Sequence, residues 1–166
     1  MADGLEITFE GMDKFNSNMM TLSGPTAELV ARRAMRAGGR VIQAAITEAA
    51  PVRPDLPSGT ALPPGALKSD IELHVVKERD GSISAIIAPG KQTSHQARWV
   101  EYGHKLVRGG RLTNWGKPGK GQEVGFVEAH PFIRPAFEAS EAAALAAAEE
   151  SVAVEITKEA QRLGFA

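Results

Sequence analysis

The stretch IELHVVKERDGSISAIIA, residues 71–88, decides the fold. Apolar and polar side chains alternate in its first half, and apolar side chains dominate its second half. Between the halves stands Asp80-Gly81, a two-residue turn signal because both positions tolerate a positive φ. The stretch therefore predicts an antiparallel hairpin in which a two-residue turn sets Val75 opposite Ile86. In that register both faces of the hairpin carry apolar side chains, so two covers are needed.

Two long helices, one before and one after the hairpin in sequence, are candidates for these covers. Residues 25–50 repeat apolar side chains every three or four positions, as a helix with one apolar stripe does. Gly38-Gly39 interrupts it at a cost of about 1 kcal/mol per glycine relative to alanine, so we expect either a close approach of another backbone or a bend. Residues 136–163 have similar spacing and predict a helix of roughly 42 Å, part of which packs outside its own fold. The second cover is either this C-terminal helix or a neighbouring subunit.

The rest of the chain predicts two extended loops and several short elements. The loops are the proline-rich residues 51–66 and the glycine-rich residues 103–128. The short elements are a strand at 5–10, an amphipathic helix at 12–22, a helix or helix-to-strand segment at 94–102 and a strand at 123–128. We therefore expect one α+β domain over residues 1–166, a small and mainly antiparallel sheet packed by a long internal helix and a long C-terminal helix.

The composition is that of an ordinary globular protein and excludes several classes. The 166 residues carry a net charge of -1, without the basic excess that a dedicated nucleic-acid binder usually has. The chain has no cysteine, which excludes disulfides and thiolate zinc sites. No stretch approaches the roughly 18 apolar residues that span a bilayer. The first residues lack the basic start and apolar run of a secretion signal, so none is expected.

Two separate stretches resemble the sequence pattern of a known family. Residues 97–103 read ARWVEYG and residues 129–137 read AHPFIRPAF. They resemble the phage neck or tail-completion proteins, the gene-product-ten type of long-tailed bacteriophages, whose pattern is hydrophobic-valine-Glu-aromatic-Gly and then Ala-x-Pro-Phe-hydrophobic-Arg-Pro-Ala. The upstream residues that also fit the family are Ala50, Pro51, Gly65, Ala66, Leu67, Ser69 and Ile71. In this order the resemblance covers nearly the whole chain.

The resemblance has departures. His104 stands where the family usually has a small hydroxyl residue, and the loops at 52–64 and 105–128 are longer than the family pattern. The resemblance implies a protein that assembles into a ring, and ring subunits usually touch their neighbours through such loops. The contacts with partner proteins are therefore not carried over from the family.

The resemblance implies a small α+β virion subunit without enzymatic activity or cofactor, made in the cytoplasm of the bacterial host. It implies a homo-oligomeric ring at the head–tail junction, between head-closure or connector proteins and the tail tube or its terminator. DNA would pass through the lumen without sequence-specific binding. A hexamer is the first expectation and a dodecamer the second. A tail-terminator ring that caps the tail tube and an assembly chaperone absent from the finished particle are the alternatives.

Eight motif residues are expected to have structural or interface roles: Trp99, Glu101, Tyr102, Gly103, Pro131, Phe132, Arg134 and Pro135. Gly103 suits a positive-φ turn or a tight contact. The two prolines suit an extended lead into the C-terminal helix, and Phe132 suits the core. Glu101 is either an anchoring or inter-subunit carboxylate, or a solvated or locally hydrogen-bonded one. The Arg134 guanidinium is an attractive partner for it.

Five basic residues follow the first motif with no acid until Glu123: Lys105, Arg108, Arg111, Lys117 and Lys120. We expect this glycine-rich segment to dock on an adjacent ring, with a plain solvated loop as the first alternative. Contact with DNA in the lumen ranks last, because a strongly cationic lumen would bind phosphates and slow the passage of DNA.

No motif for catalysis is complete. The segment Gly110–Lys117 has the wrong spacing for a phosphate loop, and Pro118 replaces the hydroxyl residue. No serine or histidine stands in a recognisable nucleophile setting. A metal-dependent hydrolase is the alternative from another class, although the spacing of its candidate ligands matches no helical pair; they are His95, Glu101, His104 and His130.

Overall fold

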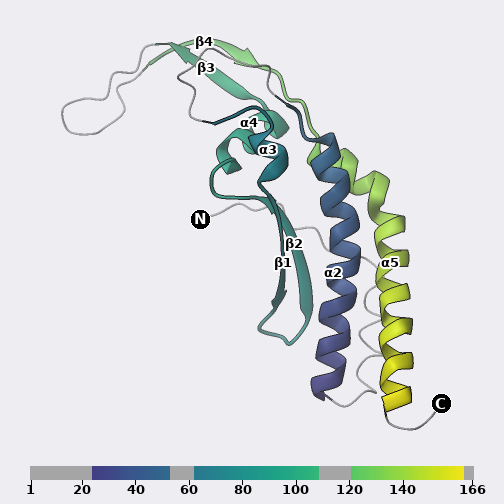
Figure 1. The fold of residues 1–166 in the computed structure, drawn as a ribbon. Helices are drawn as coiled ribbons and strands as arrows, with labels where there is room; N and C mark the ends of the chain where they lie inside the picture. The colour runs from purple at the N-terminus through teal and green to yellow at the C-terminus, as the bar shows by residue number, and fades with distance from the viewer. Residues whose placement is uncertain (1–23, 53–61, 109–120, 163–166) are drawn as a thin grey trace.

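The computed structural model describes residues 24–52, 62–108 and 121–162 (Figure 1). The strand expected at 5–10 and the helix expected at 12–22 lie outside these ranges. Within them the chain forms α2 (Gly24–Ala49), α3 (Ala66–Ser69), β1 (Ile71–Lys77), β2 (Ile83–Pro89), α4 (Ser94–Tyr102), β3 (His104–Arg108), β4 (Gln122–Val127) and α5 (Ile133–Arg162). The fold is α+β, as the sequence predicts. The strands within the described ranges form two antiparallel two-stranded sheets, β1–β2 and β3–β4, in place of one sheet.

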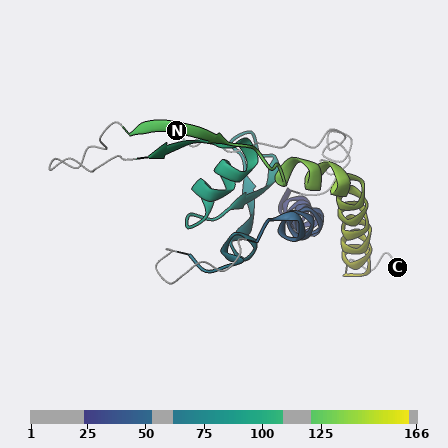
Figure 2. The ribbon, with the colours of Figure 1, turned by 90° about the horizontal axis from the view of Figure 1, so that it is seen from above.

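Helix α2 is the middle layer of the molecule. Helix α5 runs antiparallel along one side of α2, and the β1–β2 hairpin lies along another (Figures 1 and 2). The predicted stripe of α2 supplies the fully buried residues Ile42 and Ile46. They share one hydrophobic cluster with Leu67 of α3, Ile71 of β1 and Ala144 of α5. Burial against two neighbours accounts for the wide apolar surface of α2.

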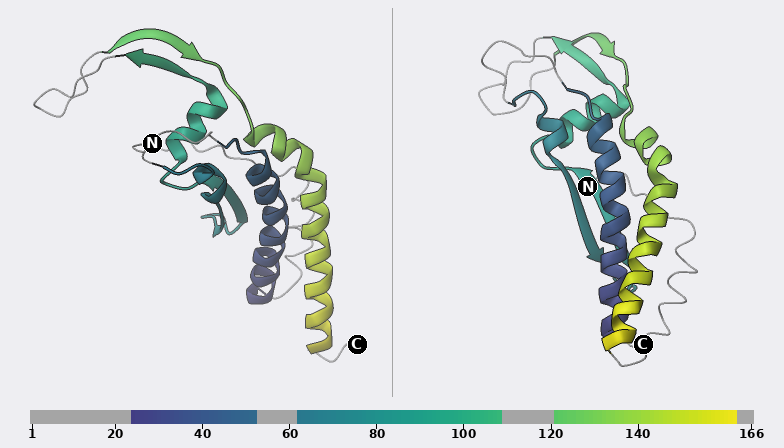
Figure 3. Two further views of the ribbon diagram at one scale, coloured as in Figure 1. Left: turned by 45° about the horizontal axis from the view of Figure 1, so that its top comes forward. Right: turned by 45° about the vertical axis from the view of Figure 1, so that its right-hand side comes forward.

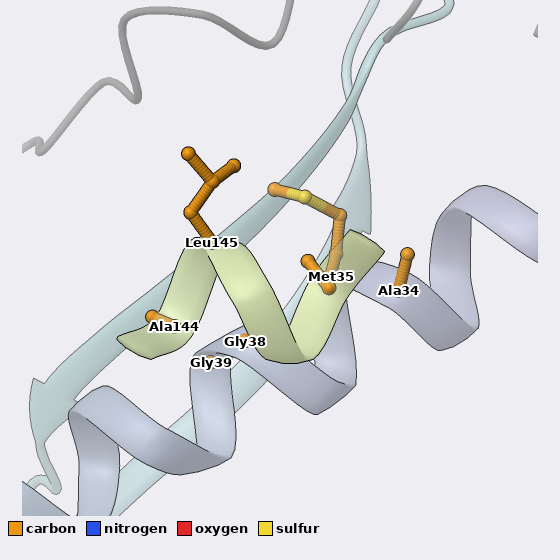
Figure 4. A pocket seen from close by; sticks show the side chains of 7 residues that line it. Ala34, Met35, Gly38, Gly39, Ala144 and Leu145 are labelled. Atoms are coloured by element: carbon orange, nitrogen blue, oxygen red, sulfur yellow. The ribbon is translucent and has the colours of Figure 1, made fainter. Parts of the chain in front are cut away.

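Gly38 and Gly39 let α2 approach its two neighbours closely. A Cβ atom built on Gly38 would lie 2.8 Å from the backbone oxygen of Ala144 in α5. A Cβ atom built on Gly39 would lie 2.7 Å from Cδ1 of Leu73 in β1. Figure 4 shows the small residues of both helices meeting at this crossing. Since α2 runs unbroken past both glycines, close backbone approach is their role.

The β1–β2 hairpin has a register one residue away from the one expected from its turn signal. Val75 pairs with Ala85, and not with Ile86. The Gly81 N–H donates to the Glu78 oxygen at 3.1 Å, and Gly81 has a φ of 90°. This is a type I turn followed by a glycine bulge, so the loop holds three residues instead of two.

The observed register changes which side chains of β2 face α2, because a shift of one residue moves every side chain of a strand to the opposite face of the sheet. Ala85 and Ile87 now lie on the α2 side with Leu73. Ile86 lies on the opposite face and is 45% exposed. Helix α5 packs chiefly on α2, so the outer face of the hairpin is not covered by the C-terminal helix.

Asp70, which immediately precedes β1, connects the start of this strand to the start of α4 through hydrogen bonds. Its Oδ2 atom accepts hydrogen bonds from the Thr93 backbone N–H at 3.0 Å and from the Thr93 hydroxyl at 2.8 Å. Its backbone oxygen accepts the Gly90 N–H at 2.6 Å. A side chain at position 90 would collide with the Asp70 carboxylate, so glycine is needed there. These contacts hold α4 at one end of the hairpin.

Residues 103–128 are expected from the sequence to form an extended loop with a strand at 123–128. The strand is confirmed as β4, but the loop also contains the unexpected strand β3. The two strands form an antiparallel hairpin that projects from the rest of the molecule (Figure 3). We call this hairpin the arm. Residues 109–120, which join its strands, lie outside the described ranges. None of the helices in the described part of the chain is long and apolar enough to cross a membrane.

Candidate functional site

The two sequence motifs meet where α4 ends and α5 begins. Glu101 stands near the C-terminal end of α4, and its side chain is buried. Its Oε2 atom accepts the backbone N–H groups of Phe132 at 2.8 Å and Ile133 at 3.0 Å. Its Oε1 atom accepts the backbone N–H of Arg134 at 3.3 Å. The first N–H groups of a helix have no partner within the helix, and the positive end of the helix dipole favours a carboxylate there. Glu101 is therefore the anchor of α5.

The ion pair expected between Glu101 and the Arg134 side chain does not form. Arg134 is exposed, and the Glu101 carboxylate meets the Arg134 backbone instead of its guanidinium. Among the described residues, no ion pair joins these two side chains. The backbone donors were already available at the helix start, so the buried carboxylate is satisfied without a cation.

The residues on either side of this anchor stabilise the first turn of α5. Phe132 is 5% exposed and belongs to the core cluster, whereas Pro131 and Pro135 lie on the surface. Pro135 is in the first turn of α5, where its missing N–H removes no intrahelical bond. A second link lies beside the anchor: the His130 N–H donates to the Val100 oxygen at 2.7 Å.

Gly103 turns the chain from α4 into the arm. It has a φ of 70°, which favours glycine. A Cβ atom there would lie 2.6 Å from the Val127 oxygen and 2.8 Å from Cζ of Phe126. Both reasons predicted for this glycine, the positive φ and the tight contact, are present. The next residue, His104, stacks on Trp99 with ring centroids 5.1 Å apart.

The arm exposes almost all of its side chains. Every residue of β4 is exposed, and so is every residue of β3 except His104. Five of them are large apolar residues, at 39–62% exposure: Leu106, Val107, Val124, Phe126 and Val127. Side chains alternate between the two faces of a strand, so Phe126 and Val127, which lie in the regularly paired part of the arm, point to opposite faces. The arm is thus apolar on both faces, and within the described part of the chain neither face is covered.

The basic residues expected to dock on a partner are only partly within the described ranges. Lys105 pairs with Glu123 across the arm at 2.9 Å, and Arg108 lies exposed at the far end of β3. The other three, Arg111, Lys117 and Lys120, lie outside the described residues. Lys105 and Arg108 therefore belong to strands and not to a loop.

An apolar groove of about 420 Å³ lies at the base of the arm. We call it the α4 groove. Its walls come from the residues that follow α2, from α3 and the residues before it, from α4 and from the inner end of the arm. They include Val52, Leu67, Trp99, Val100, His104 and Val127. Val52 and Trp99 are 54% and 50% exposed. Tyr102 is 53% exposed on the neighbouring surface of α4, so the aromatic residues of the first motif face outward.

The histidines considered as metal ligands do not form a cluster. In the described ranges, no group of three or more histidine, aspartate or glutamate side chains is placed to hold a metal ion. The Glu101 carboxylate is engaged by backbone N–H groups, His130 lies on the groove rim, and His95 is exposed on α4.

Sequence reasoning missed two features of this site. The first is strand β3, whose residues were assigned to a loop. Its signal is weak: two apolar stretches, Leu106–Val107 and Val124–Val127, flank a glycine-rich segment, as in a hairpin with a long connection. The second is Asp70, whose contact with Thr93 positions α4. No sequence signal marks that contact, because the two residues are distant in sequence.

Comparison with known proteins identifies the family. The family model described as "Bacteriophage HK97-gp10, putative tail-component" matches residues 13–103, more than half of the chain. The match includes the first motif and ends at Gly103, before the arm and α5. No curated protein and no solved structure matches. The chain therefore belongs to the HK97-gp10-like family of bacteriophage tail components.

Proposed function

We propose that this protein is a structural subunit that forms a homo-oligomeric ring at the head–tail junction of the phage particle. Membership of the family makes it a phage tail component. The finer proposal rests on the arm, which carries large apolar side chains on both faces and leaves them exposed. An exposed apolar surface of this kind marks a site of protein association.

The physics of a two-stranded sheet supports this proposal. An isolated hairpin in water is marginally stable, and it gains stability when an apolar face is covered. The arm packs mainly on itself within the described part of the chain. Identical subunits that bind one another through two different surfaces close into a ring when the rotation between them closes. In such a ring a connector protein would bind one face and the tail the other, with DNA passing through the lumen without sequence-specific contacts.

The first test is the mass of the purified full-length protein, measured by light scattering over a concentration series beside electron microscopy. We expect a ring with a central hole, a hexamer before a dodecamer. A variant with Leu106→Ser, Val107→Ser and Phe126→Ser should stay monomeric with an unchanged circular dichroism spectrum. A wild-type protein that is monomeric at every concentration and absent from purified phage particles would contradict the proposal.

The particles made by a phage that lacks this protein distinguish a subunit of the head–tail junction from a tail-terminator subunit. Loss of a junction subunit should leave filled heads and tails of normal length that do not join. Loss of a tail-terminator ring, the second candidate, should give tubes of uncontrolled length. Presence in purified virions excludes an assembly chaperone. The proposal includes no catalysis and no cofactor, and stoichiometric zinc or manganese in the purified protein would contradict that part.

A further inference from the structure

We infer that the arm of one copy docks in the α4 groove of the next copy. This inference rests on the proposed function, because it names the contact that would build the ring. It commits to a second copy of this chain as the occupant of the groove. The argument combines the exposure of the arm, the position of the groove and the charges of the two surfaces.

The arm needs burial on two opposite faces. Lys105 pairs with Phe126 and His104 with Val127, so Phe126 and Val127 belong to opposite faces of the hairpin. A flat surface can cover only one of these faces. A groove can contact an inserted hairpin on more than one side, and it therefore suits the arm better than a flat patch.

The α4 groove lies where a neighbour's arm could extend an existing apolar surface. His104 and Val127, the innermost pair of the arm, form part of the groove wall. An arm inserted from a neighbour would therefore pack against the base of the host's own arm. Each copy would receive one arm and contribute one, so a single type of contact would repeat around the ring.

The charges of the two surfaces are complementary. Lys105 is already paired with Glu123, which leaves Arg108 as the cation at the far end of β3. On the groove wall, Glu128 is exposed. Among the described residues, neither Arg108 nor Glu128 has an ion-pair partner within the chain. Opposite charges at the rim of an apolar contact guide orientation more than they add affinity.

Cross-linking tests the contact directly, because the chain has no cysteine of its own. One preparation of the full chain carries Val107→Cys on the arm, and the other carries Val52→Cys in the groove. After mixing at high concentration, a short bis-maleimide should join the two preparations. The matched control replaces the arm cysteine by Glu150→Cys on the exposed surface of α5. We expect about tenfold more cross-linked heterodimer from the arm–groove pair than from the control. An equal yield from both pairs overturns the inference.

A mixing experiment tests whether the arm of one copy binds the α4 groove of another copy. Phe126→Asp damages the arm and leaves the groove, whereas Val52→Asp damages the groove and leaves the arm. Each variant alone should lose self-association, while an equimolar mixture should form a dimer and nothing larger. A mixture that forms no dimer, although wild-type protein assembles, would mean that the arm and the groove do not meet.

The two proposals can fail separately. If the cross-link fails but the protein is present at the junction of purified particles, the arm binds another virion protein and only the docking inference falls. If the cross-link forms but the protein is absent from particles, the contact exists and the proposed function falls.

Discussion

The body and the arm of this protein use apolar residues in opposite ways. The body, formed by α2, α5 and the β1–β2 hairpin, buries its apolar stripe within the chain, and Ile42 is fully buried. The arm holds Phe126 at 62% and Leu106 at 49% exposure. In the body, Gly38 lets the backbone of α5 approach α2 so closely that an added Cβ would lie 2.8 Å from the Ala144 oxygen. The apolar pattern of the body therefore specifies the fold of one chain, whereas that of the arm is available for contacts between chains.

The largest effect is expected at the junction of the two regions. Glu101→Ala removes the acceptor of three backbone N–H groups, one of which belongs to the buried Phe132. We expect the free energy of unfolding to fall by about 2 to 3 kcal/mol, because buried donors lose their partner. Urea unfolding measures this change. The control Glu150→Ala, on the exposed surface of α5, should change stability by less than about 0.5 kcal/mol. Equal losses from both variants would show that Glu101 is no anchor.

A slightly smaller effect is expected inside the body. Gly38→Val forces a side chain against the backbone of Ala144, so the two helices must separate. Overpacking of this kind should lower the free energy of unfolding by about 2 kcal/mol. The same substitution in the arm, Gly125→Val, meets open space and should be nearly neutral. Chemical denaturation of both variants sharpens the comparison, and a large loss from the arm variant would contradict it.

The ion pairs of Glu28, at the edge of the body, should make a smaller contribution to stability than Glu101 or Gly38. This contribution should depend on pH. Glu28 of α2 receives hydrogen bonds from Lys77 of β1 at 2.6 Å and from Arg32 at 2.9 Å. The hydrogen bond from Lys77, followed by that from Arg32, holds the pKa of the Glu28 carboxyl below its ordinary value. A lowered carboxyl pKa contributes stability above the unfolded-state pKa, and this contribution is lost as the pH falls through the folded-state pKa.

Glu28→Gln should therefore flatten the fall of the melting temperature as the pH drops below about 4.3. Thermal unfolding at a series of pH values measures this difference. Because the pair is exposed, added salt should shrink it. The opposite trend, a steeper loss in the variant at acidic pH, would show that the Glu28 carboxylate does not stabilise the body.

The smallest effect on stability is expected in the arm. Replacing Leu106 and Phe126 by serine removes side chains that are already 49% and 62% exposed. We expect the free energy of unfolding to change by less than about 0.5 kcal/mol. Self-association, followed by light scattering, should nevertheless be lost. A drop in stability as large as that of Gly38→Val would mean that the arm belongs to the core of the chain.

The sequence predicts the body better than the arm. Apolar spacing predicts both long helices, because each of them packs through a regular stripe. The hairpin at residues 71–88 is also predicted, but its register is not. Both of its faces carry apolar side chains, so periodicity cannot choose between two registers that differ by one residue. The turn decides, and it uses Gly81 as a bulge after a type I turn.

The site is predicted only in part, for a different reason. The suggested pairing of Glu101 with Arg134 is found at the Arg134 backbone and not at its guanidinium, whereas the role of Gly103 follows from its residue type. The partners of Glu101 do not follow from sequence, since backbone N–H groups carry no residue identity. The partner that the motif itself suggests for Glu101 is the side chain of Arg134. Strand β3 is missed because its pairing with β4 spans a long connection, and such contacts leave little local signal.

The anchored ends of the arm have a consequence for how such chains can diverge. The arm leaves the body after Gly103 and returns just before His130, whose backbone N–H donates a hydrogen bond of 2.7 Å to the Val100 oxygen in the body. With the ends fixed, doubling the length of a flexible connection costs only about 0.6 kcal/mol of closure entropy. Evolution can therefore lengthen, shorten or replace the segment while the body stays the same. The stretch between Gly103 and His130 is also a natural place to graft a foreign peptide onto this scaffold, because Glu101 then keeps its contacts with the start of α5.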